Sequence, residues 1–301
     1  MLQLTKRQPR SLSGKVVAIT GAARGIGYAT ARLLADRGAV VAVGDLDGDL
    51  AEAVAAQLGG GAFGVGFDVT DNAAFTSFLD GVEHRLGPVD VLINNAGIMS
   101  DGLIEDEDEA LTAREIAINL HAVIHGTREA VRRMKPRGRG HVVNVSSAVS
   151  KVPGARAATY TGTKFGVAGF SEAVALELVG TGVEISVVRP SVCHTDMTAG
   201  FKGLRGMPFI EPDDVAARIV EALERPRFDV PVPKSMGPLL WLNQALPFRA
   251  RVALARATKA DTVLSSVDRG ERAAYAARLQ RVTASAHEPG AHLRARDKAA
   301  G

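Results

Sequence analysis

A tyrosine and a lysine four residues apart, Tyr160 and Lys164, are the strongest candidates for chemistry in this sequence. The segment around them, Ala157–Val179, has a helical pattern, and residues four apart lie on one face of a helix. A free tyrosine has a pKa of about 10, which is too high for an acid or base at neutral pH. An ammonium group one turn away favours the phenolate and is expected to lower that pKa. The spacing therefore predicts that Tyr160 is a general acid/base.

Two polar residues earlier in the chain complete a candidate catalytic set. Ser147 follows a predicted strand thirteen residues before Tyr160, and its hydroxyl can stabilise charge on a carbonyl oxygen by donating a hydrogen bond. Asn119 lies in the helical pattern Arg114–Met134, and we expect its amide to interrupt the helix and to hold a water that relays protons to Lys164. Each residue alone also fits an ordinary role, as a helix-surface side chain, a helix cap or a core amide. Together and in this order they favour catalysis.

A glycine-rich turn near the N-terminus predicts a site for a phosphate group. Its sequence, G-A-A-R-G-I-G, leads from a predicted strand into a predicted helix. Glycine lets the backbone approach a ligand closely, and a helix N-terminus offers free N–H groups and the positive end of a dipole. The spacing differs from the dinucleotide fingerprint G-x-G-x-x-G, so a tight junction without a ligand is the alternative. The residues expected at a dinucleotide are Gly21, Arg24, Gly25, Ile26 and Gly27.

The residue that ends the second predicted strand, Asp45, bears on the choice between NAD and NADP. A carboxylate there can accept hydrogen bonds from ribose hydroxyls, and it repels a 2′-phosphate, so NAD is favoured. Arg24 argues for NADP, since a guanidinium can bind that phosphate. The alternative role of Asp45 is to cap the predicted helix Leu46–Leu58.

More candidate cofactor contacts follow the third and fourth predicted strands, where the carboxyl ends of parallel strands open onto a ligand crevice. Asp68 can cap the next helix or accept the adenine amino group. Asn94 is expected to tie neighbouring strands together, and the small residues after it let a ring lie against the backbone. The cofactor contacts predicted here are Asp68, Val69, Asn95, Ala96 and Gly97.

The elements that must position these residues alternate regularly from Lys15 to about Pro233. Short apolar runs alternate with longer helical patterns, which is typical of a parallel sheet covered on both faces. Right-handed crossovers then give a doubly wound (Rossmann) α/β fold in three layers. The predicted strands are Val16–Thr20, Val40–Gly44, Phe63–Phe67, Val89–Ile93, His141–Val145 and Glu184–Val188, and the predicted helices include Ile26–Arg37, Leu46–Leu58, Asn72–Leu86 and Phe165–Val179.

Four parts are expected along the chain: an N-terminal flap (1–13), one catalytic domain (14–235), a helical extension (236–283) and a flexible tail (284–301). In the extension, Met236–Lys259 is amphipathic and broken at Pro247, and Asp268–Val282 has the pattern of another helix. An apolar cluster is expected to pack against the main domain or another subunit. Membrane contact helped by nearby arginines is the less favoured alternative. The cluster is Leu239, Leu240, Trp241, Leu242, Leu246 and Phe248, and the arginines are Arg249, Arg251 and Arg256.

Composition narrows the function classes. The 301 residues are 46% hydrophobic and 23% charged, as in soluble globular proteins. Met1–Ser13 is basic but lacks the apolar segment of a secretory signal, and no apolar run is long enough to span a membrane. The single cysteine, Cys193, excludes an internal disulfide and a cysteine-based zinc site, and it fits the cytoplasm. No metal site is expected. From Leu240 onward 11 Lys/Arg stand against 5 Asp/Glu, but no reader motif accompanies them, so nucleic-acid binding is not expected.

The motif set resembles the short-chain dehydrogenase/reductase superfamily over about residues 13–233. The resemblance rests on Thr20-Gly21-x-x-x-Gly25-x-Gly27, Asn94–Gly97, Asn119, Ser147 and Tyr160-x-x-x-Lys164. It implies a seven-stranded Rossmann sheet, an Asn-Ser-Tyr-Lys tetrad, a nicotinamide cofactor bound in part by Tyr160 and Lys164, and a homodimer or homotetramer. The family often has Pro-Gly after the sixth strand, whereas Ser191 follows proline here. Further cofactor contacts are expected at Pro190, Val192 and Thr195.

The resulting hypothesis is an oxidoreductase that interconverts a secondary alcohol and a ketone. Tyr160 removes or returns the hydroxyl proton while hydride moves to or from NAD, with NADP as the alternative. The substrate pocket is expected at Ile98–Leu103, Ala148–Arg156 and Ser191–Met207, whose small or apolar residues favour a lipophilic substrate. A non-catalytic dinucleotide-binding regulator is the competing hypothesis, but such a protein would normally have lost Tyr160 or Lys164.

Overall fold

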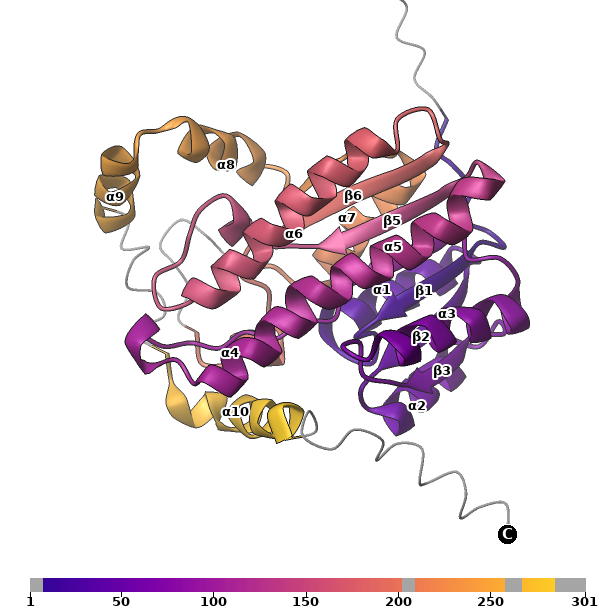
Figure 1. The fold of residues 1–301 in the computed structure, drawn as a ribbon, viewed down its shortest axis with the longest axis horizontal. Coiled ribbons are helices and arrows are strands. Elements are labelled where there is room, and N and C mark those ends of the chain that lie inside the picture. The colour runs from indigo at the N-terminus through magenta and orange to yellow at the C-terminus, as the bar shows by residue number, and fades with distance from the viewer. Residues whose placement is uncertain (1–7, 202–208, 258–266, 285–301) are drawn as a thin grey trace, which may run out of the picture.

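Seven parallel strands form one sheet in a computed structural model that describes residues 8–201, 209–257 and 267–284 (Figure 1). The strand order is β3-β2-β1-β4-β5-β6-β7. The order reverses between β1 and β4, which in a doubly wound fold opens a ligand crevice at the carboxyl ends of the strands. The strands are β1 Val16–Thr20, β2 Val40–Asp45, β3 Phe63–Gly66, β4 Val91–Asn94, β5 Gly140–Val145, β6 Val183–Pro190 and β7 Asp229–Val232.

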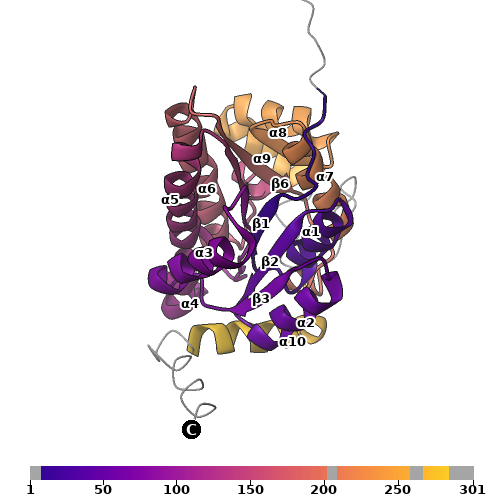
Figure 2. The ribbon, with the colours of Figure 1, turned by 90° about the vertical axis from the view of Figure 1, so that its right-hand side faces the viewer.

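Helices cover both faces of the sheet and enclose two apolar cores (Figure 2). One core lies under α1, α2 and α7, and the other lies under α3, α5 and α6. The strands between them are buried on both faces, which explains their nearly continuous apolar sequences. The helices are α1 Gly25–Asp36, α2 Gly48–Leu58, α3 Asn72–Leu86, α4 Glu109–Ile116, α5 Ala122–Met134, α6 Ala158–Glu177, α7 Pro212–Glu224, α8 Met236–Ala245, α9 Phe248–Ala257 and α10 Arg269–Ala284.

The predicted doubly wound sheet is confirmed, and all six strands expected from periodicity are present within a few residues of their predicted bounds. The seventh, β7, was implied only by the family resemblance. It is four residues long and contains Pro231, and proline is tolerated there because β7 lies at the edge of the sheet. The helical pattern Arg114–Met134 is broken, as expected at Asn119, by a π-helical turn at Ala117–His121.

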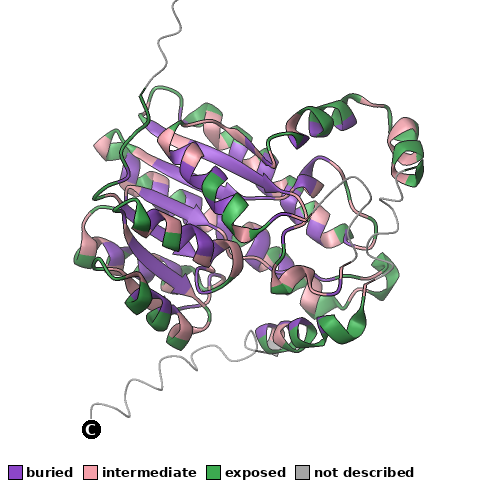
Figure 3. Cartoon of the chain, turned by 180° about the vertical axis from the view of Figure 1, so that it is seen from behind, coloured by how far each residue is buried: buried purple, intermediate pink, exposed green. Residues whose placement is uncertain are grey.

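The predicted break at Pro247 in the C-terminal extension is confirmed, because Pro247 lies between α8 and α9. Met236 and Leu240 of α8 pack on Ala148, but much of the remaining apolar cluster stays exposed, including Trp241 at 62% (Figure 3). Packing against the main domain is therefore correct for only part of the cluster. The last helix, α10, turns back to contact α4 and joins the core under α3 and α5. No helix among the described residues is both long and apolar enough to cross a membrane.

The predicted N-terminal flap and C-terminal tail lie partly outside the described residues. The described end of the flap lies on the domain: Leu12 is buried, and Arg10 forms an ion pair with Glu184 at 3.0 Å. Nearly all of the predicted tail, 285–301, falls outside.

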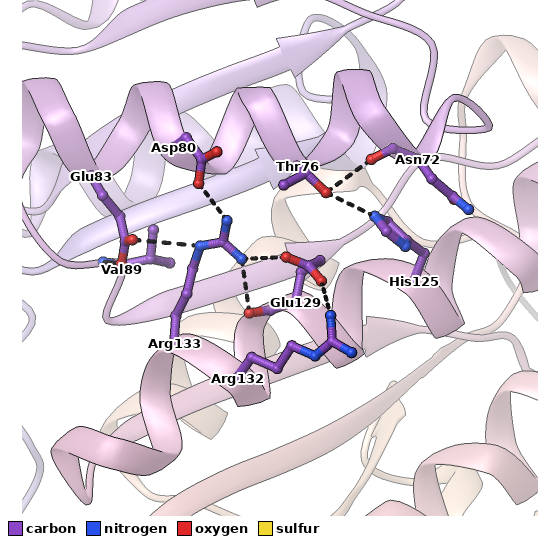
Figure 4. Close-up of polar contacts among 9 residues, drawn as sticks. All are labelled: Asn72, Thr76, Asp80, Glu83, Val89, His125, Glu129, Arg132 and Arg133. Atoms are coloured by element: carbon purple, nitrogen blue, oxygen red, sulfur yellow. Dashed lines mark hydrogen bonds and ion pairs between the residues drawn. The ribbon is translucent and has the colours of Figure 1, made fainter.

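One arginine, Arg133 on α5, fastens that helix to α3 (Figure 4). Its guanidinium lies 2.5 Å from Asp80, 3.4 Å from Glu83 and 2.5 Å from Glu129. Burial alone would raise the pKa of Glu129, but the hydrogen bond and charge of Arg133, together with the charge of Arg132, outweigh it and hold that pKa below its usual range. The Glu129 carboxylate is only 9% exposed, so it depends on Arg133 for compensation.

We predict that Arg133→Met destabilises the fold by about 1–3 kcal/mol at pH 7, because it leaves a buried carboxylate without its partner. Because the folded pKa of Glu129 is depressed, its stabilising contribution is present above the unfolded pKa and is lost as pH falls through the folded value. The deficit of the variant should therefore shrink below about pH 4.5. Urea unfolding of the wild type and the variant, at pH 7 and at a pH below about 4.5, measures this difference in stability. The control is Arg132→Met, whose side chain pairs with the same carboxylate but is 69% exposed. Equal effects of the two substitutions would contradict the prediction.

Candidate active site

A cavity of about 680 Å³ opens at the carboxyl ends of the strands, where the strand order reverses. It brings together predicted residues from seven separate places in the sequence. Gly27, Val192 and Asn119 were predicted as well but do not line it. The predicted residues that line the cavity are Gly21, Arg24, Gly25, Ile26, Asp45, Asp68, Val69, Asn95, Ala96, Gly97, Ser147, Tyr160, Lys164, Pro190 and Thr195.

The glycine turn is held in a shape that only glycine accepts. Gly21 and Gly25 have φ angles of +62° and +51°, and a Cβ on Gly21 would lie 2.8 Å from the Cα of Ala96. Gly27 serves packing, since its Cβ would lie 2.2 Å from the carbonyl oxygen of Gly21. The first turn of α1 has no side-chain cap and no acidic residue, so its N–H groups are left for an anion at the cavity.

Two asparagines at the end of β4, Asn94 and Asn95, connect the glycine turn to the sheet. Asn95 donates from its side-chain amide to the carbonyl oxygens of Gly21 at 2.8 Å and Thr20 at 3.0 Å. Asn94 donates to the side-chain oxygen of Asn144 on β5 at 2.8 Å, which confirms the expected tie between neighbouring strands. These bonds fix the spacing between the glycine turn and the strands that carry the catalytic candidates.

Asp45 ends β2 at the rim of the cavity. It accepts a hydrogen bond from the backbone N–H of Ala23 at 3.0 Å. The alternative that it caps α2 is wrong, because the cap is Asp47, which accepts from the N–H of Leu50. Arg24, the residue that argued for NADP, is engaged with Asp47 at 2.7 Å. The end of β2 and the start of α2 thus carry two carboxylates, Asp45 and Asp47, within three residues.

Asp68 lines the cavity but does not cap the following helix, because Asp71 does so through two backbone N–H groups. Burial by itself would raise the pKa of Asp68, yet hydrogen bonds from Arg114 and Thr70 outweigh it and lower that pKa. Asp68 is therefore ionised at neutral pH and is held in place by Arg114 and Thr70. Arg114, a buried residue of α4, was not predicted as part of the site. The acidic partner that would have signalled its role lies 46 residues away in sequence.

Tyr160 stands in the first turn of α6, almost fully buried, with Ser147 within hydrogen-bonding reach. In the chain by itself the pKa of Tyr160 is not lowered, so the expected lowering would require the bound nicotinamide as well as Lys164. Burial raises the pKa of Tyr160 above its usual range, and the hydrogen bond with Ser147 only partly opposes that shift. Ser147 also begins a short 3₁₀ turn at Ala148–Ser150 as its cap. The cap role and the site role of Ser147 are therefore compatible.

Lys164 is buried beside Tyr160, and its Nζ lies 5.6 Å from the centre of the tyrosine ring. Nζ donates to the backbone carbonyl oxygen of Val145 at 3.0 Å. Burial lowers the pKa of Lys164 to about 8, so the ammonium that was expected to help Tyr160 is itself poorly solvated. This desolvation explains why the predicted effect on Tyr160 does not dominate.

Asn119 lies behind the cavity wall in the π-helical turn, fully buried. Its amide donates to the carbonyl oxygen of Ile98 at 2.8 Å and accepts from the N–H of the same residue at 2.9 Å. The side chain therefore holds the loop after β4 in place. The predicted relay of protons through a water to Lys164 stays a prediction.

Two observations fit a dinucleotide in this cavity. The uncapped N-terminus of α1 suits a pyrophosphate, and the hydroxyl oxygen of Ser191, buried in the wall, has no hydrogen-bond partner among the described residues. A buried hydroxyl without a partner is costly unless a ligand or water satisfies it. Tyr160 also packs in a small apolar cluster, of which Met197 lines the cavity. The other members of the cluster are Met99, Val149, Ala157 and Phe201.

The family model for short chain dehydrogenases matches residues 15–203, well over half of the chain. The chain is a short-chain dehydrogenase. A 3-alpha-(or 20-beta)-hydroxysteroid dehydrogenase of Mycobacterium tuberculosis is 38% identical over 187 residues, which is 62% of this chain and 72% of the relative. The dehydrogenase is thus an NAD(P)-dependent oxidoreductase.

Solved structures show the same fold. A short-chain dehydrogenase/reductase from Burkholderia phymatum in complex with NAD matches with a TM-score of 0.72 at 22% identity, covering 81% of this chain and 96% of that one. A 3-ketoacyl-(acyl-carrier-protein) reductase from Brucella melitensis complexed with NADH matches with a TM-score of 0.68 at 27% identity, covering 74% and 98%.

The dehydrogenase also carries a buried acid that sequence patterns did not single out. Glu115 on α4 is fully buried, accepts hydrogen bonds from the N–H and hydroxyl of Ser100, and has a second carboxyl oxygen without a partner among the described residues. Burial raises the pKa of Glu115 to about 7, against opposing hydrogen bonds from Ser100 and the field of Lys164. No local pattern marks it, because its partners come from the loop after β4.

We predict that Glu115→Gln changes how the stability of the dehydrogenase depends on pH. Because the folded pKa lies near 7 and the ordinary value is 4.5, the carboxyl costs stability as pH rises from about 4.5 to above 7. The uncharged amide avoids that cost. The variant should therefore gain on the wild type by up to about 3 kcal/mol between pH 5 and pH 8, measured by urea unfolding. Glu109→Gln, an exposed position on the same helix, is the control. Parallel stability curves for wild type and Glu115→Gln would refute the assigned shift.

Proposed function

We propose that this enzyme interconverts a secondary alcohol and a ketone by hydride transfer, with Tyr160 as the acid/base. The observation that carries the proposal is the placement of Tyr160, which faces Ser147 and lies beside Lys164 at the inner end of the cavity. A buried hydroxyl pair of this kind can hold one carbonyl or carbinol oxygen between two donors.

The chain's own residues divide the work. Ser147 donates to the substrate oxygen and Tyr160 holds the proton that moves to or from it. Lys164, anchored on the carbonyl of Val145, keeps positive charge near the phenol and would contact the nicotinamide ribose. The bound nicotinamide supplies or accepts the hydride. Residues of the glycine turn and the loop after β6 would orient the cofactor so that its ring faces Tyr160.

NAD is the proposed cofactor, with NADP as the alternative. Asp45 and Asp47 both stand at the end of β2, and Arg24 is paired with Asp47. A 2′-phosphate would have to displace that ion pair and lie against two carboxylates, which disfavours it by electrostatic repulsion. The structural relative from Brucella melitensis is complexed with NADH, which agrees with this choice.

The proposed substrate is lipophilic. The side chains around Tyr160 that are not part of the tetrad are mainly apolar, with Met99, Val149 and Met197 among them. Of the three predicted pocket segments, the first lines the cavity only through Ile98, and the third lines it through residues 191–198 apart from Val192. No residue of Ala148–Arg156 lines the cavity, and 202–207 lie outside the described residues. A relative named for a hydroxysteroid is in keeping with a bulky apolar alcohol. We further propose a homodimer or homotetramer, because α6 leaves Phe165 and Leu176 exposed. The proposed location is the cytoplasm, which the single cysteine fits.

A non-catalytic dinucleotide-binding regulator is the competing function. It would need the glycine turn but has no use for a buried acid/base. Tyr160 and Lys164 are both present, and both are buried at a cost in desolvation, which favours the enzyme.

We predict that Tyr160→Phe lowers turnover of a secondary alcohol at least about a hundredfold, because the proton-transfer group is lost. NADH affinity should stay within about twofold, since the ring remains in place and the cofactor phosphates are bound elsewhere. Steady-state kinetics on a panel of apolar alcohols and NADH fluorescence titration measure the two quantities. Tyr28→Phe, on α1, is a control. Turnover that survives in Tyr160→Phe would exclude this assignment, and a wild type that binds NADH but turns over no alcohol in the panel would favour the regulator.

A second prediction concerns the cofactor itself. The wild type should bind NADH at least about tenfold more tightly than NADPH, and Asp45→Ser should narrow that ratio by removing one of the repelling carboxylates. Fluorescence titration with each nucleotide gives the ratio directly. A wild-type preference for NADPH would show that Arg24 outweighs the carboxylates.

A further inference from the structure

The helix α10 docks on the domain through one narrow stripe. Arg272, Tyr275, Leu279 and Val282 are buried, whereas the residues between them are exposed or half-buried. The spacing, three then four then three residues, keeps these four side chains on one face of a helix. This helix lies beyond residue 203, where the match to the short-chain dehydrogenase family ends.

Arg272 fixes the position of α10 relative to two loops that flank the cavity. Its Nε lies 2.6 Å from a carboxyl oxygen of Asp101, and its terminal nitrogens donate to the carbonyl oxygens of Met197 at 2.7 Å and Met99 at 3.2 Å. One turn further on, the hydroxyl of Tyr275 accepts from the N–H of Met99 at 2.9 Å. The helix therefore has a defined register against the loop after β4 and the loop after β6.

The second half of α10 passes along the open side of the cavity. Arg278 and Val282 are among the residues that line it. Arg281 lies close enough to Asp47 at the end of β2 to contribute to the lowered pKa of that carboxyl, behind the hydrogen bonds from Arg24 and Leu50. In Figure 2, α10 runs below the sheet towards α2, which agrees with this path. The helix thus extends from the Tyr160 end of the cavity to the β2 rim.

Two neighbouring residues, Asp196 and Thr195, connect Arg278 to the glycine turn. Its Nη1 lies 2.9 Å from a carboxyl oxygen of Asp196, and the preceding residue, Thr195, packs on Gly25 so closely that a Cβ there would be 3.3 Å from the threonine methyl. The turn is where the N–H groups of α1 would receive a pyrophosphate. Arg278 therefore faces the anion-binding part of the cavity.

The other arginines and the lysine that line the cavity have partners of their own. Arg24 pairs with Asp47, Arg114 pairs with Asp68, and Lys164 donates to a backbone carbonyl. Arg278 contacts Asp196 through one terminal nitrogen, and its guanidinium lies 5.3 Å from the centre of the Tyr275 ring. A guanidinium has five N–H donors in a fork that suits phosphate oxygens, so donors remain for a ligand. Its side chain is 31% exposed and Asp196 is 63% exposed, so the pair can adjust without leaving a buried charge.

We propose that α10 is the outer wall of the dinucleotide site and that Arg278 binds the pyrophosphate of the cofactor. The proposal rests on the function proposed above, in that it requires the cavity to hold a nicotinamide dinucleotide. Asp196 acts as the competitor that holds Arg278 in place before the nucleotide enters.

The test is fluorescence titration with NADH, together with competition by ADP-ribose, which carries the pyrophosphate but no nicotinamide. Arg278→Gln is expected to weaken both ligands by the same factor, about tenfold, because one charge-assisted phosphate contact is lost. Asp196→Asn is expected to change affinity in the opposite direction, by a few fold, because it frees the guanidinium. Arg269→Gln, an exposed arginine in the first turn of α10, is the matched control and should leave both affinities unchanged.

Each outcome decides between the alternatives. Unchanged affinities in Arg278→Gln, or the same small loss in Arg269→Gln, would overturn the pyrophosphate contact. Loss of NADH affinity with ADP-ribose affinity retained would place Arg278 at the nicotinamide end and would overturn the proposal as well. If Arg278→Gln unfolds, Asp196→Asn decides the question through the sign of its effect. A wild type that binds neither NADH nor NADPH would contradict the proposed function rather than the role of Arg278.

Discussion

Desolvation is the interaction on which the chemistry of this site depends. Tyr160 and Lys164 are buried side by side, and burial acts on them in opposite directions, because it raises the pKa of a phenol and lowers that of an ammonium. At neutral pH the phenol therefore stays neutral, whereas Lys164, with a pKa of about 8, still carries most of its positive charge. With little water to screen it, such a site responds strongly to any charge that a ligand brings. The same burial that makes Tyr160 a poor acid in the free chain makes it sensitive to the cofactor.

The backbone is shaped around these buried groups by one break in a helix. The π-helical turn at Ala117–His121 directs Asn119 inward, where its amide satisfies both backbone groups of Ile98. Glu115, one turn earlier, binds the loop at Ser100 from the same side. Two side chains from one interrupted helix thus order a loop that neither strand nor helix pairing would hold. Gly97 of that loop packs closely against Asn119 and Lys164. A Cβ on Gly97 would come within 3.2 Å of the amide oxygen of Asn119.

Periodic and local features of the site were predictable from the sequence, whereas its pairings were not. Alternating strands and helices, the glycine turn and the spacing of Tyr160 and Lys164 are short-range patterns, and the structure has all of them. Asp45 and Asp68 were candidate caps, yet the caps are Asp47 and Asp71, because a run with several acids does not show where the backbone first turns helical. Which carboxylate meets which arginine depends on contacts between distant segments.

The docking of α10 illustrates the same limit and explains why the helix holds its place. The sequence predicts a helix near Asp268–Val282, but arginine is rarely buried, so the pattern does not mark Arg272 as part of the docking face. In the folded chain Arg272 is 5% exposed and completes the apolar stripe, because Asp101 and two backbone carbonyls surround its guanidinium. Since the partners come from both loops that flank the cavity, Arg272 ties the loop after β4 to the loop after β6 through one guanidinium. A segment outside the matched family region therefore contributes polar contacts that hold these two loops together.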